Sequence, residues 1–225
     1  MPRVIVFDVV ETLLDLSALD PFFADLFGDP SAREAWFTQL LQNALVSTVV
    51  GEYRNFEVLG LSALTMLAEK RGVEVSLADR ARLQGHLLKL PAHPDALPAL
   101  ERLREEGYRL ATLTNSVGLA GESELRFAGL RDFFEQALSA DSVKRLKPAP
   151  EPYRYAAEKL GVEPGGFWMV AAHAWDMAGA ANAGCRTAFV GRPSQVLDPG
   201  APKPDVTGET LRDVAEGILA VQALG

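Results

Sequence analysis

The 225-residue sequence has a single cysteine and lacks any long hydrophobic run. With Cys185 alone, the chain can form neither an internal disulfide nor a thiolate metal cluster, which fits a reducing compartment. No apolar run approaches the roughly 20 residues that a membrane-spanning helix needs. The apolar stretch near the N-terminus is also too short for a secretory signal. We therefore expect a cytoplasmic protein that spans no membrane.

Positive charge is also scarce. Lysine and arginine number 22 against 30 acidic residues, which gives a formal net charge of −8, and no run of basic residues is longer than two. Nucleic acids and anionic membranes attract proteins through clustered positive charge, so neither is an expected partner. With 48% hydrophobic and 23% charged residues, the composition indicates one large globular domain or a core with an insertion. We expect the partner to be a small-molecule substrate.

The hydrophobic pattern divides the chain into two kinds of region. From residue 14 to 94, apolar residues recur at the three-and-four spacing of amphipathic helices, with breaks at Gly28, Gly51 and Gly72. Elsewhere, short apolar runs alternate with amphipathic helices. The runs that predict strands are residues 3–7, 109–114, 133–138, 167–172 and 187–191. The Pro/Gly-rich residues 193–204 indicate a surface loop.

The connections between these predicted strands are too long for hairpins and contain helices. Such a pattern indicates a mostly parallel sheet that is buried on both faces. We therefore predict an α/β fold, in which a Rossmann-like parallel sheet core has helices on both faces and carries an inserted helical cap. The predicted core domain comprises residues 1–13 and 95–225, and the predicted cap domain comprises residues 14–94.

Polar side chains follow four of the predicted strands at their carboxyl ends. They are Asp8 and Thr12, then Thr114, Asn115 and Ser116, then Lys147 with Tyr153, and finally His173, Trp175 and Asp176. Each one alone has an ordinary explanation as a turn former, a helix cap or a solvated charge. Ligands of open α/β sheets bind beyond the carboxyl ends of the strands, where these residues would converge. We therefore expect two acids, one lysine and several hydroxyl or amide groups to share a pocket.

Four stretches carry a resemblance to a known family. They are "DVVETL" from residue 8, "LTNS" from 113, "LKPAPEPY" from 146 and "AWD" from 174. Their sequences, order and spacing resemble the haloacid dehalogenase superfamily, and the resemblance spans nearly the whole chain, including the helical cap after the first strand. It implies that Asp8 is a nucleophile that forms a covalent ester. It also implies that Lys147 keeps Asp8 ionised, while Thr12, Thr114 and Asn115 orient the carboxylate and the substrate.

Two positions argue against the phosphatases of this superfamily. Those enzymes carry a second aspartate two residues after the nucleophile, which protonates the leaving oxygen, and here that position is Val10. Losing a positioned general acid typically costs about 10² to 10⁴ in rate. They also hold Mg²⁺ with an acidic residue four positions before the one that Asp176 occupies, and here that position is Ala172. The chain therefore lacks two groups that phosphatase chemistry needs.

The resemblance then favours the type II 2-haloacid dehalogenase branch, which needs no metal because halide leaves without a proton. Tyr153, six residues after Lys147, and the pair Trp175 and Asp176 support this branch. By resemblance, Asp8 attacks the carbon that bears the halogen, displaces halide with inversion and forms an ester. Asp176, with help from neighbouring polar groups, would position or activate the water that hydrolyses the ester.

Four positions near the expected site differ from the residues of that branch. Val10 stands where the dehalogenases have tyrosine, and Glu11 where they have glycine. We expect Glu11 to turn into solvent or to pair with a cap arginine, since a carboxylate pointing inward would raise the pKa of Asp8. Ala171 replaces a serine, and His173 replaces an asparagine. His173 titrates near neutrality and is either the base for the hydrolytic water or a structural residue.

A further difference lies in the cap, where an ungapped alignment puts Phe37 at the position of the halide-binding arginine. Arg33 and Arg54 are close in sequence, and a helix could bring either one to the pocket. If neither reaches it, halide stabilisation must come from Asn115, Trp175 and apolar packing.

Three hypotheses remain open. The first is a metal-independent hydrolase that forms an Asp8 ester with a small 2-haloacid or another carbon electrophile. The second is a Mg²⁺-dependent phosphatase in which Glu11 replaces the lost acid. The third is a binding protein that kept the fold and lost efficient chemistry. The resemblance also suggests a homodimer.

Overall fold

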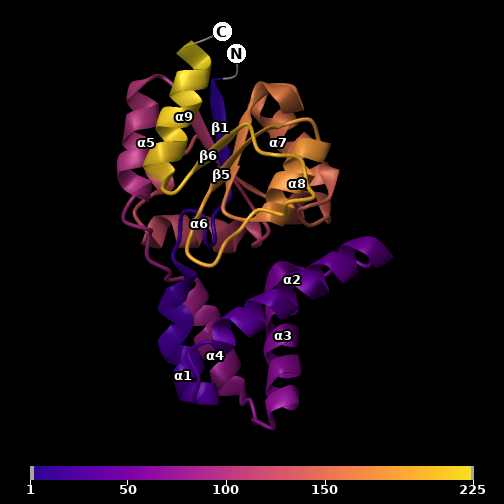
Figure 1. The fold of residues 1–225 in the computed structure, drawn as a ribbon. Coiled ribbons are helices and arrows are strands. Elements are labelled where there is room, and N and C mark those ends of the chain that lie inside the picture. Colours follow the sequence, from indigo (N-terminus) through magenta and orange to yellow (C-terminus); the bar gives the residue numbers. More distant parts are fainter. Residues whose placement is uncertain (1–2, 224–225) are drawn as a thin grey trace.

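Six parallel strands form the central sheet (Figure 1). The computed structural model describes residues 3–223; residues 1–2 and 224–225, which the predicted core domain includes, lie outside this range. The strands are β1 (Val4–Phe7), β2 (Arg109–Thr114), β3 (Gln136–Ser139), β4 (Trp168–Ala171), β5 (Arg186–Val190) and β6 (Val206–Gly208). Their order is β3-β2-β1-β4-β5-β6, with parallel pairing throughout. The predicted α/β fold is confirmed, and the strand order changes direction at β1 and β4, where such sheets bind ligands.

Both faces of the sheet are covered by helices, as the continuous apolar sequence of β1 predicts. Successive strand residues point to opposite faces, so Ile5 and Phe7 pack on one side and Val4 and Val6 on the other. The first side carries α5 (Ala96–Glu105), α6 (Gly118–Phe127) and α9 (Leu211–Ala223). The second side carries α7 (Pro150–Leu160) and α8 (Ala174–Asn182). Figure 1 shows α5 and α9 on one side of the sheet and α7 and α8 on the other.

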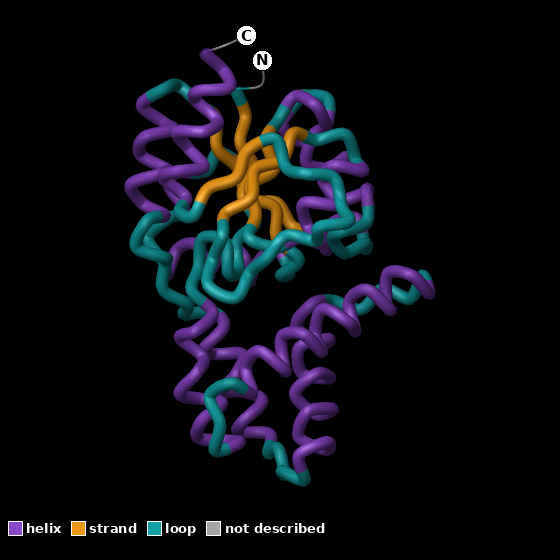
Figure 2. Tube along the Cα trace, in the orientation of Figure 1, coloured by secondary structure: helices purple, strands orange, loops and turns teal. Residues whose placement is uncertain are grey.

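A second lobe of helices faces the carboxyl ends of the strands (Figures 1 and 2). They are α1 (Asp20–Phe27), α2 (Ala32–Val50), α3 (Phe56–Arg71) and α4 (Leu77–Leu87). The first three end at Gly28, Gly51 and Gly72, which have positive φ angles. Glycine adopts this conformation without the steric cost that other residues have. The pattern breaks at these glycines therefore marked real helix ends.

The contact between α2 and α3 anchors this lobe. The indole Nε1 of Trp36 donates a 2.9 Å hydrogen bond to the carbonyl oxygen of Gly60. A Cβ atom at Gly60 would lie 3.6 Å from the Trp36 ring, an ordinary van der Waals distance, so the Trp36 ring packs directly against α3. Trp36 is buried, and it helps to hold the face of the cap that looks toward the sheet.

The sequence pattern missed one strand and misplaced the start of another. β6 follows the predicted loop at 193–204 and has only three residues, too few to show an alternating pattern. β3 begins at Gln136 because residues Arg131–Phe133 form a 3₁₀ helix instead. Other short 3₁₀ helices lie at Leu16–Leu19, Ala140–Val143 and Pro164–Gly166. Within residues 3–223, every helix is too short or too polar to cross a membrane.

Candidate active site

Asp8 lies at the carboxyl end of β1, with a buried ammonium group beside it. The Nζ of Lys147 lies 2.8 Å from Oδ1 of Asp8 and 2.6 Å from Oδ2 of Asp176. The Lys147 and Asp176 side chains are fully buried, and Asp8 is 5% exposed. The hydroxyl of Tyr153 donates to Oδ1 of Asp176 at 2.6 Å. The structure therefore brings together the nucleophile, the lysine, the second acid and the tyrosine that the motifs single out.

The charges in this cluster fix its protonation state. Burial alone would raise the pKa of Asp8, but the Lys147 charge and His173 together hold that pKa well below its usual value. Burial would lower the pKa of Lys147, but the carboxylates of Asp176 and Asp8 outweigh it and raise that pKa. Asp8 is therefore an ionised carboxylate, as a nucleophile must be.

Asp176 differs from Asp8 although it shares the same lysine. Burial raises the pKa of Asp176, and the Lys147 charge offsets this only in part. One carboxylate oxygen accepts from Lys147 and the other from Tyr153. Burial and the nearby Asp176 charge raise the Tyr153 pKa well above its usual value, so Tyr153 stays a donor. Asp176 therefore orients Lys147 in the resting state.

Three polar side chains hold the backbone around the cluster. Thr12 Oγ1 donates to Oδ2 of Asp8 at 2.7 Å and accepts from the backbone N–H of Ala172 at 3.0 Å. Asn115 Oδ1 accepts from the backbone N–H of Lys147 at 2.8 Å, and its amide nitrogen lies 3.4 Å from the Lys147 carbonyl. Thr114 Oγ1 accepts from the backbone N–H of Ser116 at 3.1 Å. Thr114 and Asn115 were expected to bind substrate, but their described side-chain hydrogen bonds are all made with the backbone.

Glu11 occupies a strained backbone position, and its side chain is held by several partners. Its φ is +65°, a left-handed conformation that costs a non-glycine residue about 1–2 kcal/mol. Its Oε2 lies 2.8 Å from Nε2 of His173 and 3.1 Å from Nε2 of Gln195. Its Oε1 lies 3.6 Å from Nη1 of Arg33. Of the two expectations for Glu11, pairing with a cap arginine is the one that the structure shows.

His173 is placed between two carboxylates. Its Nε2 contacts Glu11, and its Nδ1 lies 3.5 Å from Oδ2 of Asp8 without a hydrogen-bond partner. Burial would lower the pKa of His173, but Asp8 and Glu11 raise it to about 9. His173 is therefore protonated at neutral pH and donates protons, so the interpretation of His173 as a water base does not fit this geometry.

Aromatic rings enclose His173. Its ring centroid lies 5.1 Å from that of Trp175, nearly stacked, and 5.8 Å from that of Phe37 in the cap. The indole Nε1 of Trp175 is buried without a partner. The ring of Trp175 also lies under the Lys147 ammonium, 5.8 Å from its centroid. Nδ1 of His173 thus faces the Asp8 carboxylate, whereas the indole N–H of Trp175 has no described acceptor.

Two cavities adjoin this cluster, and Phe37 lines both. One, of about 520 Å³, is polar and includes Glu11, Arg33, His173 and Trp175. The other, of about 170 Å³, is mostly apolar and includes Val10. Phe37 therefore stands at the junction where the alignment put it. Of the two arginines considered beside it, Arg33 reaches the polar cavity, whereas Arg54 is exposed to solvent.

The positions of the charged groups also bear on metal binding. The Lys147 ammonium stands between the carboxylates of Asp8 and Asp176, within 2.8 Å of each. Across residues 3–223, no group of three or more His, Cys, Asp or Glu side chains is arranged to hold a metal ion. The carboxylate of Glu11, which the phosphatase hypothesis needs as a free acid, is held by its three partners.

The sequence pattern missed several residues near the site. Arg192 donates two hydrogen bonds to the Thr12 carbonyl, at 2.7 and 3.2 Å, and one to Asp95 at 2.8 Å, which fixes the loop after Asp8. Arg192 follows β5, so the expectation that site residues lie at the carboxyl ends of strands would have included it if the fifth strand had been considered. Glu57 and Glu124 lie on helices, where a glutamate gives no sequence signal of a site.

Comparisons with known proteins agree with the motifs. The model of a family of haloacid dehalogenase-like hydrolases matches residues 2–184. The (S)-2-haloacid dehalogenase 4A of Burkholderia cepacia is 32% identical over 194 residues, covering 84% of this chain and 83% of that protein. The L-2-haloacid dehalogenase RSc1362 has a TM-score of 0.92 at 26% identity, covering 97% of this chain and 99% of that one. A dehalogenase solved as an intermediate complex has a TM-score of 0.86 at 30% identity, covering 93% and 94%. The resemblance is confirmed, and the chain belongs to the haloacid dehalogenase-like hydrolase family.

Proposed function

We propose that this protein is a 2-haloacid dehalogenase that works through a covalent ester at Asp8. The observation that carries the proposal is the buried contact between the ionised Asp8 carboxylate and the Lys147 ammonium, at 2.8 Å. Relatives that are 32% identical over most of their length are (S)-2-haloacid dehalogenases, which supports the same reaction class here. The substrate class is a small acid with a halogen on its second carbon.

In the first step, one oxygen of Asp8 attacks the carbon that bears the halogen. A new carbon–oxygen bond forms while the carbon–halogen bond breaks, and its electron pair leaves with the halide. Lys147 and Thr12 hold the two oxygens of Asp8, so the carboxylate is oriented before the substrate arrives. Because halide needs no proton on leaving, this step does not need the acid that the phosphatases carry at the position of Val10.

The departing halide needs hydrogen-bond donors or positive charge. Asn115 is not free for this role, since its side-chain amide is engaged with the Lys147 backbone. The remaining buried donors are the protonated His173, whose Nδ1 faces Asp8, and the indole N–H of Trp175, which has no described acceptor. We assign halide stabilisation to these two groups, in place of the cap arginine that Phe37 replaces.

In the second step, water adds to the acyl carbon of the Asp8 ester. The alkoxide of the product takes up the proton that the water loses, and the Asp8 carboxylate is regenerated. His173 is a poor base here because its pKa is about 9. Once Asp8 is esterified, Asp176 is the carboxylate left beside Lys147, so we assign the positioning of the water to Asp176. The proposed reaction uses no metal ion, because Lys147 supplies the positive charge.

The proposal is tested by titrating free halide from L-2-chloropropionate. We expect release by the native protein and none above background by Asp8→Asn, with equal release in the presence and absence of EDTA. No release by the native protein would contradict the proposal. Release that EDTA abolishes would contradict the metal-independent mechanism while leaving the reaction class intact.

A further inference from the structure

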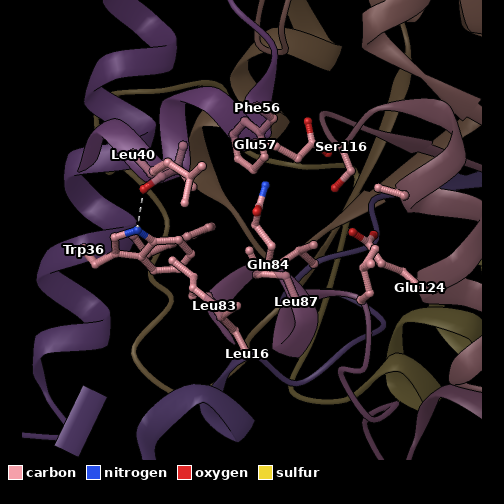
Figure 3. A pocket seen from close by; sticks show the side chains of 16 residues that line it. Leu16, Trp36, Leu40, Phe56, Glu57, Leu83, Gln84, Leu87, Ser116 and Glu124 are labelled. Atoms are coloured by element: carbon pink, nitrogen blue, oxygen red, sulfur yellow. Dashed lines mark hydrogen bonds between the residues drawn. The ribbon is translucent and has the colours of Figure 1, made fainter. Parts of the chain in front are cut away.

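An apolar cavity of about 170 Å³ lies between the cap and the core. Figure 3 shows its walls, to which Trp36, Leu40 and Leu83 of the cap contribute. Val10, two residues after Asp8, lines the same space. A substrate attacked by Asp8 could therefore extend into this cavity with the rest of its chain. Even at roughly 30 Å³ for each water-sized group, the space holds at least about five or six non-hydrogen atoms.

Two carboxylates line the cavity from opposite lobes, Glu57 from α3 and Glu124 from α6 (Figure 3). Glu124 is 4% exposed, and its Oε2 has no hydrogen-bond partner. Glu57 accepts from the backbone N–H of Val117 at 2.9 Å with one oxygen, and its Oε2 is buried without a partner. Two acceptor oxygens are thus left unsatisfied at one small cavity.

These carboxylates are costly to bury as they stand. Burial raises the pKa of Glu124 to about 7, and the charges of Glu57 and Asp8 add to the rise. Burial also raises the pKa of Glu57. Within the described chain, the charged groups that act on these two glutamates are all carboxylates. The cavity therefore has apolar walls and a negative potential without a countercharge.

A purely structural role explains part of this arrangement but not all of it. The bond from Val117 to Glu57 ties the cap to the start of α6, and a glutamine could accept it equally well. Glu124 contacts only the nearby Ser116 hydroxyl, which a glutamine could also do, and a neutral residue would avoid the desolvation cost of the carboxylate. Buried acceptors that lack partners are uncommon in folded proteins. At a cavity, they match a ligand that brings its own N–H donors.

We propose that this cavity binds the side chain of the substrate and selects 2-haloacids whose alkyl chain ends in an ammonium group. Glu57 and Glu124 receive the N–H donors, and the walls pack on the methylene groups. A chain of four carbons and one nitrogen fits the volume, as in 2-chloro-6-aminohexanoate. The assignment to a substrate side chain rests on the proposed dehalogenase function, whereas the preference of the cavity for an alkylammonium does not.

Binding of a fragment tests the cavity without any turnover. Titration calorimetry should compare n-butylammonium with butan-1-ol, which has the same size but no charge. We expect the ammonium to bind at least about tenfold more tightly, and this preference to vanish in Glu57→Gln and in Glu124→Gln. Glu69→Gln is the matched control, because Glu69 lies on α3 but is exposed. Equal binding of both fragments, or a preference that survives both cavity variants, overturns the proposal.

Measurements of turnover then test the cavity as a substrate-binding subsite separately from the dehalogenase reaction. We expect kcat/KM for 2-chloro-6-aminohexanoate to exceed that for 2-chlorohexanoate at least about tenfold, and Glu124→Gln to reduce this ratio toward one. Suppose that the protein releases halide from 2-chloropropionate but does not prefer 2-chloro-6-aminohexanoate to 2-chlorohexanoate. This result overturns the proposed binding of an ammonium group and leaves the dehalogenase function intact. Binding of n-butylammonium with no halide release from any substrate supports the subsite and removes the proposed function.

Discussion

Buried charges are paired at the end of β1 but are left without a countercharge at the apolar cavity between the cap and the core. At the end of β1, Lys147 contacts Asp8 and Asp176, and each oxygen of both acids has a described partner or a neighbouring cation. Beneath the cap, Glu57 and Glu124 each keep an oxygen without a partner. The paired cluster is complete before substrate arrives, whereas the cap-facing carboxylates are complete only with a ligand. The chemistry is thus built into the core, and the proposed selection of substrates into the boundary between core and cap.

The largest effect is expected at the nucleophile. Asp8→Asn removes the charged oxygen that attacks the substrate, and we expect halide release to fall by at least about 10⁴-fold. The fold should survive, because asparagine is isosteric and can still accept from Thr12. Circular dichroism checks the fold beside the halide assay, and substantial residual turnover by a folded variant would contradict the role of Asp8.

Lys147→Met should show what the paired cluster contributes to stability. The substitution leaves the carboxylates of Asp8 and Asp176 buried without their cation, so we expect a loss of about 3–5 kcal/mol in the free energy of unfolding. Urea unfolding at pH 7 measures it. A loss below about 1 kcal/mol, typical of a surface ion pair, would mean that water reaches these groups.

His173 should give the protein a stability that declines in alkali. Its pKa is raised from 6.5 to about 9 in the folded state, so its contribution is complete below about pH 6.5 and is lost as the pH rises through 9. A shift of this size corresponds to about 3 kcal/mol. We expect unfolding free energies to fall between pH 6.5 and 9 in the native protein.

His173→Asn is the control for that decline, because asparagine does not titrate. The fall over this pH range should shrink by most of its size in the variant. Halide release should also drop above pH 9 in the native protein, since a neutral imidazole stabilises halide less well. A variant whose unfolding profile matches the native one would show that another group causes the decline.

The smallest effect should come from Glu124→Gln, and its sign should be opposite to that of Lys147→Met. The Glu124 pKa is raised to about 7, so ionisation destabilises the fold as the pH rises from about 4.5 to 7. We expect the stability of the variant relative to the native protein to rise by up to about 3 kcal/mol between pH 4.5 and pH 8. Urea unfolding at both values checks the difference, and destabilisation at pH 8 would indicate a structural partner for Glu124.

The parts of the molecule that repeat a pattern could be predicted from the sequence. Apolar runs separated by helices predict a parallel sheet, and glycines with positive φ mark the ends of the cap helices. The sequence also predicted that Asp8, Lys147 and Asp176 share one pocket, because the carboxyl ends of parallel strands lie at one edge of a sheet. The three-residue β6 was missed because it is too short to show a period.

The features of the site that depend on contacts between distant residues could not be predicted. Whether Glu11 faces solvent or His173 depends on a left-handed turn and on Gln195, which is 184 residues away in the chain. The raised pKa of His173 depends on that same contact. In the sequence, Glu57 and Glu124 cannot be told from solvent-exposed glutamates of a helix. Only the packing of the cap on the core shows that they line a cavity.

The most direct test of the covalent ester at Asp8 is a single turnover of L-2-chloropropionate in water enriched with oxygen-18, with protein in excess over substrate. If Asp8 forms an ester that water opens at its acyl carbon, the label must enter the Asp8 carboxylate, and the lactate released must carry unlabelled oxygen from the protein. Peptide mapping and product mass spectrometry read the two outcomes. Label in the first lactate formed, with none in the peptide that contains Asp8, would show that water attacks the substrate directly and would contradict the account.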